Sequence, residues 1–255
     1  MRDRAELKSM MEECYARFSR REYALHDPVS FLYRYEDPGD AEVAGLMAAL
    51  LAFGRLAQIM RSVEDALRRL GPSPRRFVLD AAPAGLRSAC AGFVHRTVDA
   101  DSLARLLCGI RDVLRAHGSL EACFLAHDDP AMPTILPGLT GLAEELCGGG
   151  RGPSALLADP GRGSACKRWN LYLRWMVRQD AVDRGLWRGV SPARLIVPLD
   201  AHMWRVCRSL GLTQRATCGM KAALEITAAF DAICPGDPVR YDFSLMHASV
   251  EGALG

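Results

Sequence analysis

A chain of 255 residues is long enough for one large domain or two small ones, and 49% hydrophobic with 24% charged residues is an ordinary globular balance. No apolar run reaches the roughly 18 residues that a membrane span needs, and residues 1–18 mix both charge signs without the apolar core of a signal peptide. We therefore expect a cytoplasmic protein with no membrane partner.

Helical periodicity dominates the pattern in chain order. We expect Asp40 to cap a helix over 41–54, Asp101 or Ser102 to cap a helix over 102–118, and a loop over 179–194. Only the apolar stretch 195–199 resembles a strand, and Pro198 argues against a central one. The sequence predicts an all-α protein with helices over 4–18, 41–54, 56–71, 102–118, 131–152, 201–210, 221–233 and 241–254, a short helix and tight hairpin over 153–163, and a helix after Ser164.

The nine cysteines are scattered along the chain. They form no C-x-x-C pair, and no group of histidines and cysteines has the spacing of a zinc motif. Such a pattern is typical of reduced, mostly buried thiols. We therefore expect neither a metal nor any other cofactor.

Positive charge is concentrated in one segment. Residues 151–215 carry 12 basic and 4 acidic side chains, a net charge of +8, whereas residues 1–150 and 216–255 each carry a net charge of −3. A local excess of this kind is typical of a surface that binds a polyanion. A solvated charged face without a partner explains it equally well at this point.

Lys167 lies near the start of a basic helix in "GSACKRWNLYLRWMVR" (163–178). If Ser164 is the N-cap, the helix dipole and the neighbouring Arg168 and Arg174 all lower the pKa of the lysine. A free amine is a nucleophile, whereas arginine never loses its proton. Only three of the 32 basic residues are lysines, so the position favours a chemical role, with a plain surface lysine as the alternative.

Asp200 follows the apolar stretch 195–199 and precedes a helix. Aspartate is a favoured N-cap, which alone would explain it. The context adds a second reason, because a glycine-rich turn leads into the basic helix of Lys167, and backbone amides at such a turn suit a phosphate group. Two helix starts, one with an amine and one with a carboxylate, therefore make a candidate catalytic pair.

The segments "DPGRGSACKRWNLYL" (159–173) and "PLDAHMWRVCRSLGL" (198–212) resemble the helix-hairpin-helix DNA glycosylases, the superfamily of endonuclease III and of the adenine and 8-oxoguanine glycosylases. There an L-P-G-x-G hairpin precedes the helix of the catalytic lysine, and V-D-T-H carries the catalytic aspartate. More narrowly, the chain resembles a bacterial family of unknown function allied to that superfamily. The resemblance implies that Lys167 is a Schiff-base nucleophile and that Asp200 is the catalytic carboxylate.

This chain departs from the pattern of that superfamily in several places. Gly161 and Gly163 lie further from the lysine than usual, and Ala201 replaces the usual threonine. No cluster cysteines follow the last helix, so no iron–sulfur cluster is implied. The loop 179–194 lengthens the connection from lysine to aspartate, as in the archaeal 8-oxoguanine glycosylases, and on this ground we expect 8-oxoguanine as the excised base.

The resemblance implies two helical subdomains with a helix-hairpin-helix element and a cleft between them. Residues 41–180 would form one, ending in the hairpin, and residues 1–40 with 195–255 the other, so that Lys167 and Asp200 face each other across the cleft. The implied protein is a monomeric, nucleoid-associated DNA glycosylase with AP lyase (β-elimination) activity on double-stranded DNA containing a damaged base or an abasic site. A non-catalytic helix-hairpin-helix DNA-binding protein and an all-α interaction protein with an inherited fold remain alternatives.

Further residues receive roles from this comparison. Trp187, Trp169, Trp204 and His202 are candidates for the base pocket, although core packing is an alternative for Trp169 and Trp204 and a structural role for His202. The expected DNA contacts are Gly161, Arg162, Gly163, Ser164, Ala165, Arg168 and Arg174 around the hairpin, with Phe53, Gly54 and Arg55 as the wedge beside the vacated base.

Overall fold

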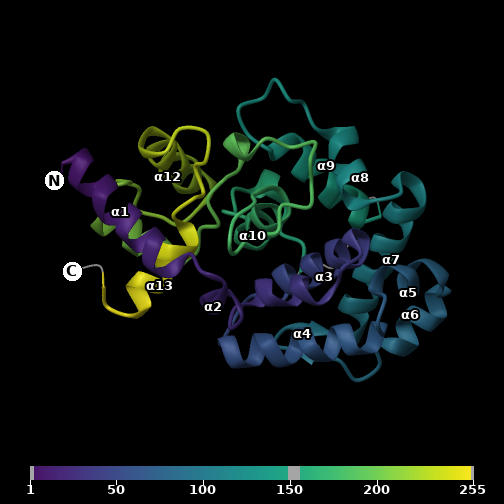
Figure 1. Cartoon of the computed structure of the whole chain (residues 1–255). Coiled ribbons are helices and arrows are strands. Elements are labelled where there is room, and N and C mark those ends of the chain that lie inside the picture. The colour runs from purple at the N-terminus through teal and green to yellow at the C-terminus, as the bar shows by residue number, and fades with distance from the viewer. Residues whose placement is uncertain (1–2, 149–155, 254–255) are drawn as a thin grey trace. The chain divides into compact units, whose positions relative to one another are not determined.

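A computed structural model describes residues 3–148 and 156–253 and consists almost entirely of helices (Figure 1). The predicted all-α class is confirmed. Extended structure within the described residues is limited to a two-residue antiparallel pair, β1 (Val94–His95) and β2 (Val98–Asp99), and one isolated bridge. No helix in the described part of the chain combines the length and the apolar character needed to cross a membrane.

The chain divides into two compact units. Unit 1 comprises Met1–His26, Pro133–Ile135 and Pro160–Gly255, and unit 2 comprises Asp27–Met132 and Leu136–Asp159. These ranges differ from the expected subdomains 41–180 and 1–40 with 195–255, since residues 160–180 join the termini and residues 27–40 join the central part. Buried ion pairs inside unit 1, described below, explain the first difference.

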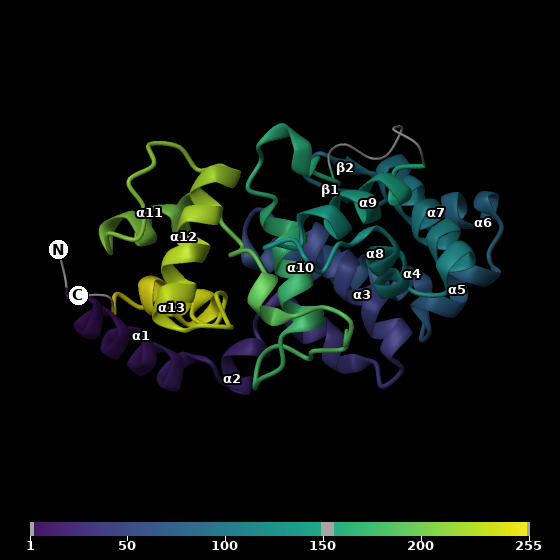
Figure 2. The same ribbon diagram turned by 90° about the horizontal axis from the view of Figure 1, so that it is seen from above.

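Unit 2 is built around α3 (Pro38–Leu50), in which every residue from Asp40 to Leu50 is buried. Figures 1 and 2 show α4 (Leu56–Leu70) alongside α3. The remaining elements of the unit are η1 (Pro28–Arg34), α5 (Pro74–Asp80), α6 (Pro83–Ala89), α7 (Ala100–His117), α8 (Leu120–His127) and α9 (Leu136–Leu146). A helix buried all round reads as continuously apolar, which is the composition of residues 43–52.

Unit 1 pairs the two ends of the chain. The helices α1 (Arg4–Phe18) and α13 (Asp242–Val250) lie side by side in Figures 1 and 2. Unit 1 also contains α10 (Lys167–Val177), whose Trp169, Tyr172 and Trp175 are fully buried. The other elements are α2 (Arg21–Ala24), η2 (Pro160–Arg162), η3 (Pro192–Arg194), α11 (Ala201–Ser209) and α12 (Met220–Ile233).

Several helix boundaries differ from those expected. Asp37, not Asp40, caps α3, because the helix already begins at Pro38. The Asp40 carboxylate instead accepts hydrogen bonds from Ser73 Oγ (2.9 Å) and the backbone N–H of Arg75 (2.8 Å) at the start of α5. Asp99 caps α7 in place of Asp101 or Ser102. The segment 195–199 forms no strand; it is buried coil.

Two further predictions concern the region before Lys167. The helix expected over 131–152 is shorter, because α9 spans Leu136–Leu146. Most of the short helix expected at the start of 153–163 lies outside the described residues, and residues 156–159 are turn and coil.

Candidate active site around Lys167 and Asp200

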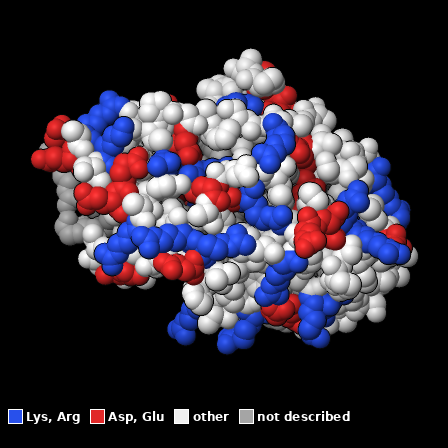
Figure 3. Space-filling view, viewed as in Figure 1, with Lys and Arg blue, Asp and Glu red and all other residues white. Residues whose placement is uncertain are grey.

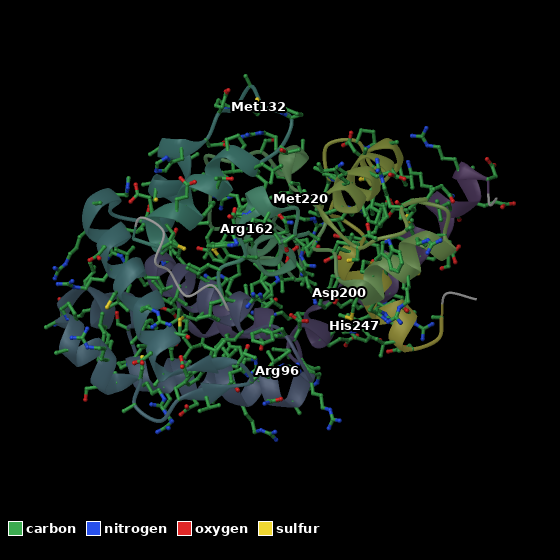
Figure 4. All side chains as sticks on the ribbon, turned by 180° about the vertical axis from the view of Figure 1, so that it is seen from behind. Arg96, Met132, Arg162, Asp200, Met220 and His247 are labelled. Carbon is green, nitrogen blue, oxygen red and sulfur yellow. The ribbon has the colours of Figure 1, made fainter. Side chains whose placement is uncertain are left out.

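Lys167 and Asp200 form a direct ion pair within unit 1. Lys167 Nζ donates a hydrogen bond to Asp200 Oδ2 at 2.8 Å. The side chains keep 36% and 39% of their surface exposed, so a substrate can reach both. The two segments that carry the family resemblance therefore bring an amine and a carboxylate together in space; Asp200 is labelled in Figure 4.

The two oxygens of Asp200 have different partners. Oδ1 accepts hydrogen bonds from the backbone N–H groups of His202 and Met203, both at 2.9 Å, which makes Asp200 the N-cap of α11. Oδ2 faces the lysine. Burial raises the pKa of this carboxyl, but the positive charge of Lys167 and the hydrogen bonds outweigh it, so the pKa lies below its ordinary value. Asp200 is consequently an oriented anion at neutral pH.

Lys167 is the first residue of α10, and Ser164 is not the N-cap expected from the sequence. Cys166 holds the cap position in a left-handed conformation with φ of 49°. Ser164 Oγ accepts a hydrogen bond from the Cys166 N–H at 3.2 Å, and Asn170 Nδ2 donates to Ala165 O at 3.0 Å. Asn170 thus ties the turn to the helix, and this residue was not predicted as part of the site.

The turn before α10 combines η2 with Gly163, whose φ of 76° favours glycine. Gly163 O accepts a hydrogen bond from the Met220 N–H at 3.0 Å, and Figure 4 shows the labelled Arg162 and Met220 near one another. Residues 161–164 are exposed, whereas Ala165 is buried. The exposed part of this turn is therefore the portion available to a phosphate group.

Of the two arginines expected to bind DNA from α10, only Arg168 reaches the surface. It is half-buried, and burial lowers its pKa. The expectation that Arg174 contacts DNA is wrong, because its side chain is 2% exposed and lies between Asp183 (Nε–Oδ1, 3.2 Å) and Asp242. Its charge is neutralised inside the protein.

The carboxylates around Arg174 continue into a larger network. Arg178 also contacts Asp183 and, from its Nε, Asp237. Burial raises the pKa of Asp183 to about 6 although Arg174 and Arg178 act in the opposite direction. Burial likewise raises the pKa of Asp242, while Arg174 and then Lys167 lower it. Asp242 thus couples the network electrostatically to Lys167. The spacing of residues along the sequence did not single out Asp242.

The aromatic candidates separate into two groups. Trp169 and Trp187 are 0% and 3% exposed, and the Trp187 ring packs edge-on against Tyr172. A flipped base cannot stack on either ring in this conformation, so both belong to the core. Trp204 and His202 are half-buried on α11 beside Asp200, and within the described structure Trp204 Nε1 and His202 Nε2 have no hydrogen-bond partner. Both nitrogens are buried, and the Arg208 guanidinium lies over the Trp204 ring, 5.0 Å from its centroid. A base would therefore reach these rings only after a local movement of side chains.

Phe53, Gly54 and Arg55 belong to unit 2. Gly54 and Arg55 are exposed, with a φ of 107° at Gly54. The half-buried ring of Phe53 packs against His95, which donates from Nε2 to Phe53 O at 3.1 Å. These three residues therefore lie at a turn of unit 2, whereas Lys167 and Asp200 belong to unit 1.

Two of the basic residues of the segment, Arg174 and Arg178, are buried in ion pairs and do not contribute to the surface. On the face viewed in Figure 3, basic and acidic side chains are interspersed. Phosphate contacts must therefore come from fewer residues than the 12 basic ones that the segment contains.

Comparison with known proteins gives a single result. No curated protein and no solved structure matches the chain. Residues 27–251 match the family described as "Protein of unknown function (DUF2400)". This match includes α10, the loop 179–194 and α11, so both residues of the ion pair lie inside it. Because the match covers most of the chain, the chain belongs to this family.

Proposed function

We propose that the protein is a base-excision DNA glycosylase with AP lyase activity, acting as a monomer on double-stranded DNA at the nucleoid and removing 8-oxoguanine. The observation that carries the proposal is the half-exposed ion pair of Lys167 Nζ and Asp200 Oδ2 at 2.8 Å. It unites the nucleophile and the carboxylate that the resemblance to the helix-hairpin-helix glycosylases implies.

In the first step the damaged nucleotide leaves the base stack, since its sugar is unreachable inside the duplex. Lys167 passes a proton to Asp200 Oδ2, which is within hydrogen-bond distance. The amine lone pair then attacks C1′ while the bond from C1′ to the base breaks, and the base leaves with that electron pair and takes up a proton. The base takes the proton that Asp200 Oδ2 accepted, which restores the carboxylate. The negative charge of Asp200, held in place by α11, then stabilises the positive charge that develops on the sugar.

In the second step the bond from C1′ to the ring oxygen breaks, and that oxygen takes up a proton. Lys167 and C1′ now form a Schiff base. Loss of a proton from C2′ sends an electron pair into a new C2′–C3′ double bond and expels the 3′ phosphate, which nicks the strand. Water then hydrolyses the Schiff base and restores the amine.

Binding of the duplex is assigned to the exposed turn 161–164 and to Arg162 and Arg168. Backbone amides at the start of a helix attract anions, and arginine pairs with phosphate through two parallel hydrogen bonds. Contacts of this type position the DNA without reading its sequence. His202 and Trp204 are the polar ring groups nearest in sequence to Asp200 and would face the flipped base.

The test is a strand-nicking assay on duplexes that each contain one damaged base, with 8-oxoguanine and an abasic site among them. The wild-type protein should nick at least one of these duplexes, and Lys167→Gln should not. Lys221→Gln is the matched control, because Lys221 is an exposed lysine in the first turn of α12 and should cut like the wild type. Absence of cleavage on all substrates would favour a non-catalytic DNA-binding protein, and absence of duplex binding an interaction protein.

A further inference from the structure

A second group of reactive side chains lies in unit 2, where α7, α8 and α9 meet. It consists of His117 at the end of α7, Cys123 in α8 and Glu145 in α9, whose potential ligand atoms lie within 4.8 Å of one another. We propose that these three residues, with His127, bind one zinc ion. The proposal is independent of the DNA chemistry assigned to unit 1.

The distances around Glu145 already approach those of a metal site. Its Oε1 lies 3.2 Å from His127 Nε2 and 3.5 Å from His117 Nε2. Zinc bonds of about 2.0–2.3 Å in a tetrahedron place the ligand atoms about 3.3–3.7 Å apart. The ligand atoms of His117, Cys123 and Glu145 lie within 4.8 Å of one another, so movements on the order of 1 Å, which changes of side-chain rotamer supply, would bring these three into this geometry. His127 would join them from its position beside Glu145.

The helices are built to bring these residues close. A Cβ at Gly141 of α9 would lie only 2.2 Å from the Cβ and Cγ of His127, and a Cβ at Gly138 only 2.6 Å from the ring of Phe124. Glycine at these positions therefore lets α8 approach α9. Cys123 and His127 are four residues apart in α8, so they share one face, and Glu145 stands one turn beyond Gly141 in α9.

The donor types select the ion. Cysteine sulfur and imidazole nitrogen favour zinc among the common divalent cations, whereas calcium and magnesium require oxygen ligands. Cys123 is fully buried, while His117, His127 and Glu145 keep 22%, 38% and 38% of their side chains exposed. The ion can therefore enter from the side of the two histidines and Glu145, which is partly exposed, and bind the buried thiol of Cys123.

The thiol of Cys123 is buried. Burial, together with the charges of Glu145 and Glu42, raises its pKa to about 12. A metal ion must displace the thiol proton to bind sulfur, and binding should therefore release a proton and weaken as the pH falls. Spacing along the sequence did not indicate this site, because its four residues come from three helices.

The experiment uses the full-length protein, stripped of metal with a chelator and titrated with Zn²⁺ against a competing dye. We expect one zinc per chain. Glu145→Gln and His127→Gln should each weaken zinc binding by at least about tenfold, the scale on which even supporting residues of metal sites act. Glu144→Gln is the matched control, because Glu144 is the exposed neighbour on the same helix and should bind like the wild type.

Cobalt provides the second readout. Bound Co²⁺ should give a thiolate-to-metal charge-transfer band in the near ultraviolet, and Cys123→Ser should remove it. Circular dichroism checks that each variant is folded. Zinc that binds equally well to Glu145→Gln and His127→Gln would lie elsewhere in the chain and overturn the proposal, as would failure of the wild type to bind stoichiometric zinc. Neither outcome depends on cleavage of DNA.

Discussion

At the scale of single residues, Asp200 combines capping of α11 with contact to Lys167. Asp200→Asn separates the two roles, because asparagine also caps helices but carries no charge. We expect the base-excision rate to fall about 10²–10³-fold, whereas the free energy of unfolding should change by no more than about 1 kcal/mol, since the pair is partly exposed. Single-turnover excision and urea denaturation measure the two effects. An unchanged excision rate would remove the carboxylate from the mechanism.

The lowered pKa of Asp200 makes a separate prediction about pH. The folded state holds the ionised form more strongly than the unfolded chain does. The resulting stabilisation is fully present above the ordinary aspartate pKa of 3.8 and is lost as the pH falls through the lower pKa of the folded state. The difference in unfolding free energy between the wild type and Asp200→Asn should therefore shrink from about pH 5 to about pH 3. A difference that stays constant over this interval would contradict the assigned pKa direction.

At the scale of elements, α10 is fixed to the rest of unit 1 by Arg174. Arg174→Ala would leave Asp183 and Asp242 with buried charge that lacks this partner. Such a change typically costs about 3–5 kcal/mol of unfolding free energy, and denaturation should show a loss of that size. Arg162→Ala, at an exposed position, should change stability by less than about 0.5 kcal/mol. Equal effects of the two substitutions would mean that the buried network does not hold the helix.

The elements also show what a sequence can and cannot predict. The ranges of α1, α4 and α11 follow from apolar periodicity and end signals, and Asp200 is the N-cap expected. The start of α10 does not follow, because the contact of Asn170 with Ala165 and the left-handed Cys166 decide it. The short helices α5, α6 and α8 were not expected, since seven or eight residues carry too little periodicity to be recognised.

The candidate site was predictable to a similar extent. Lys167 and Asp200 lie in motifs that can be read locally, and the structure pairs them. The burial of Arg174 depends on Asp242, a residue 68 positions away, and a buried arginine looks the same in a sequence as an exposed one. Trp187 lies in a loop, yet packs against Tyr172 of α10. Long-range packing of this kind leaves no local signal.

At the scale of the whole molecule, binding to duplex DNA should depend strongly on salt. Contacts between arginine and phosphate release counterions, so the affinity should fall about tenfold or more between about 50 and 200 mM salt. Arg162→Ala and Arg168→Ala should weaken binding to all duplex sequences alike and reduce the salt dependence. Fluorescence anisotropy at several salt concentrations measures both effects. An affinity that does not change with salt would exclude the proposed phosphate contacts.

The central claim is that the Lys167 amine becomes covalently attached to the sugar. Borohydride reduces a Schiff base to a stable adduct, so a cleavable or abasic duplex incubated with the protein and borohydride should yield protein joined to DNA. Peptide mapping should place the adduct on Lys167. Lys167→Gln should abolish trapping while its duplex affinity stays within a few-fold of the wild type, whereas Lys221→Gln should trap normally. Undiminished trapping by Lys167→Gln, or an adduct mapped to another residue, would contradict the assignment.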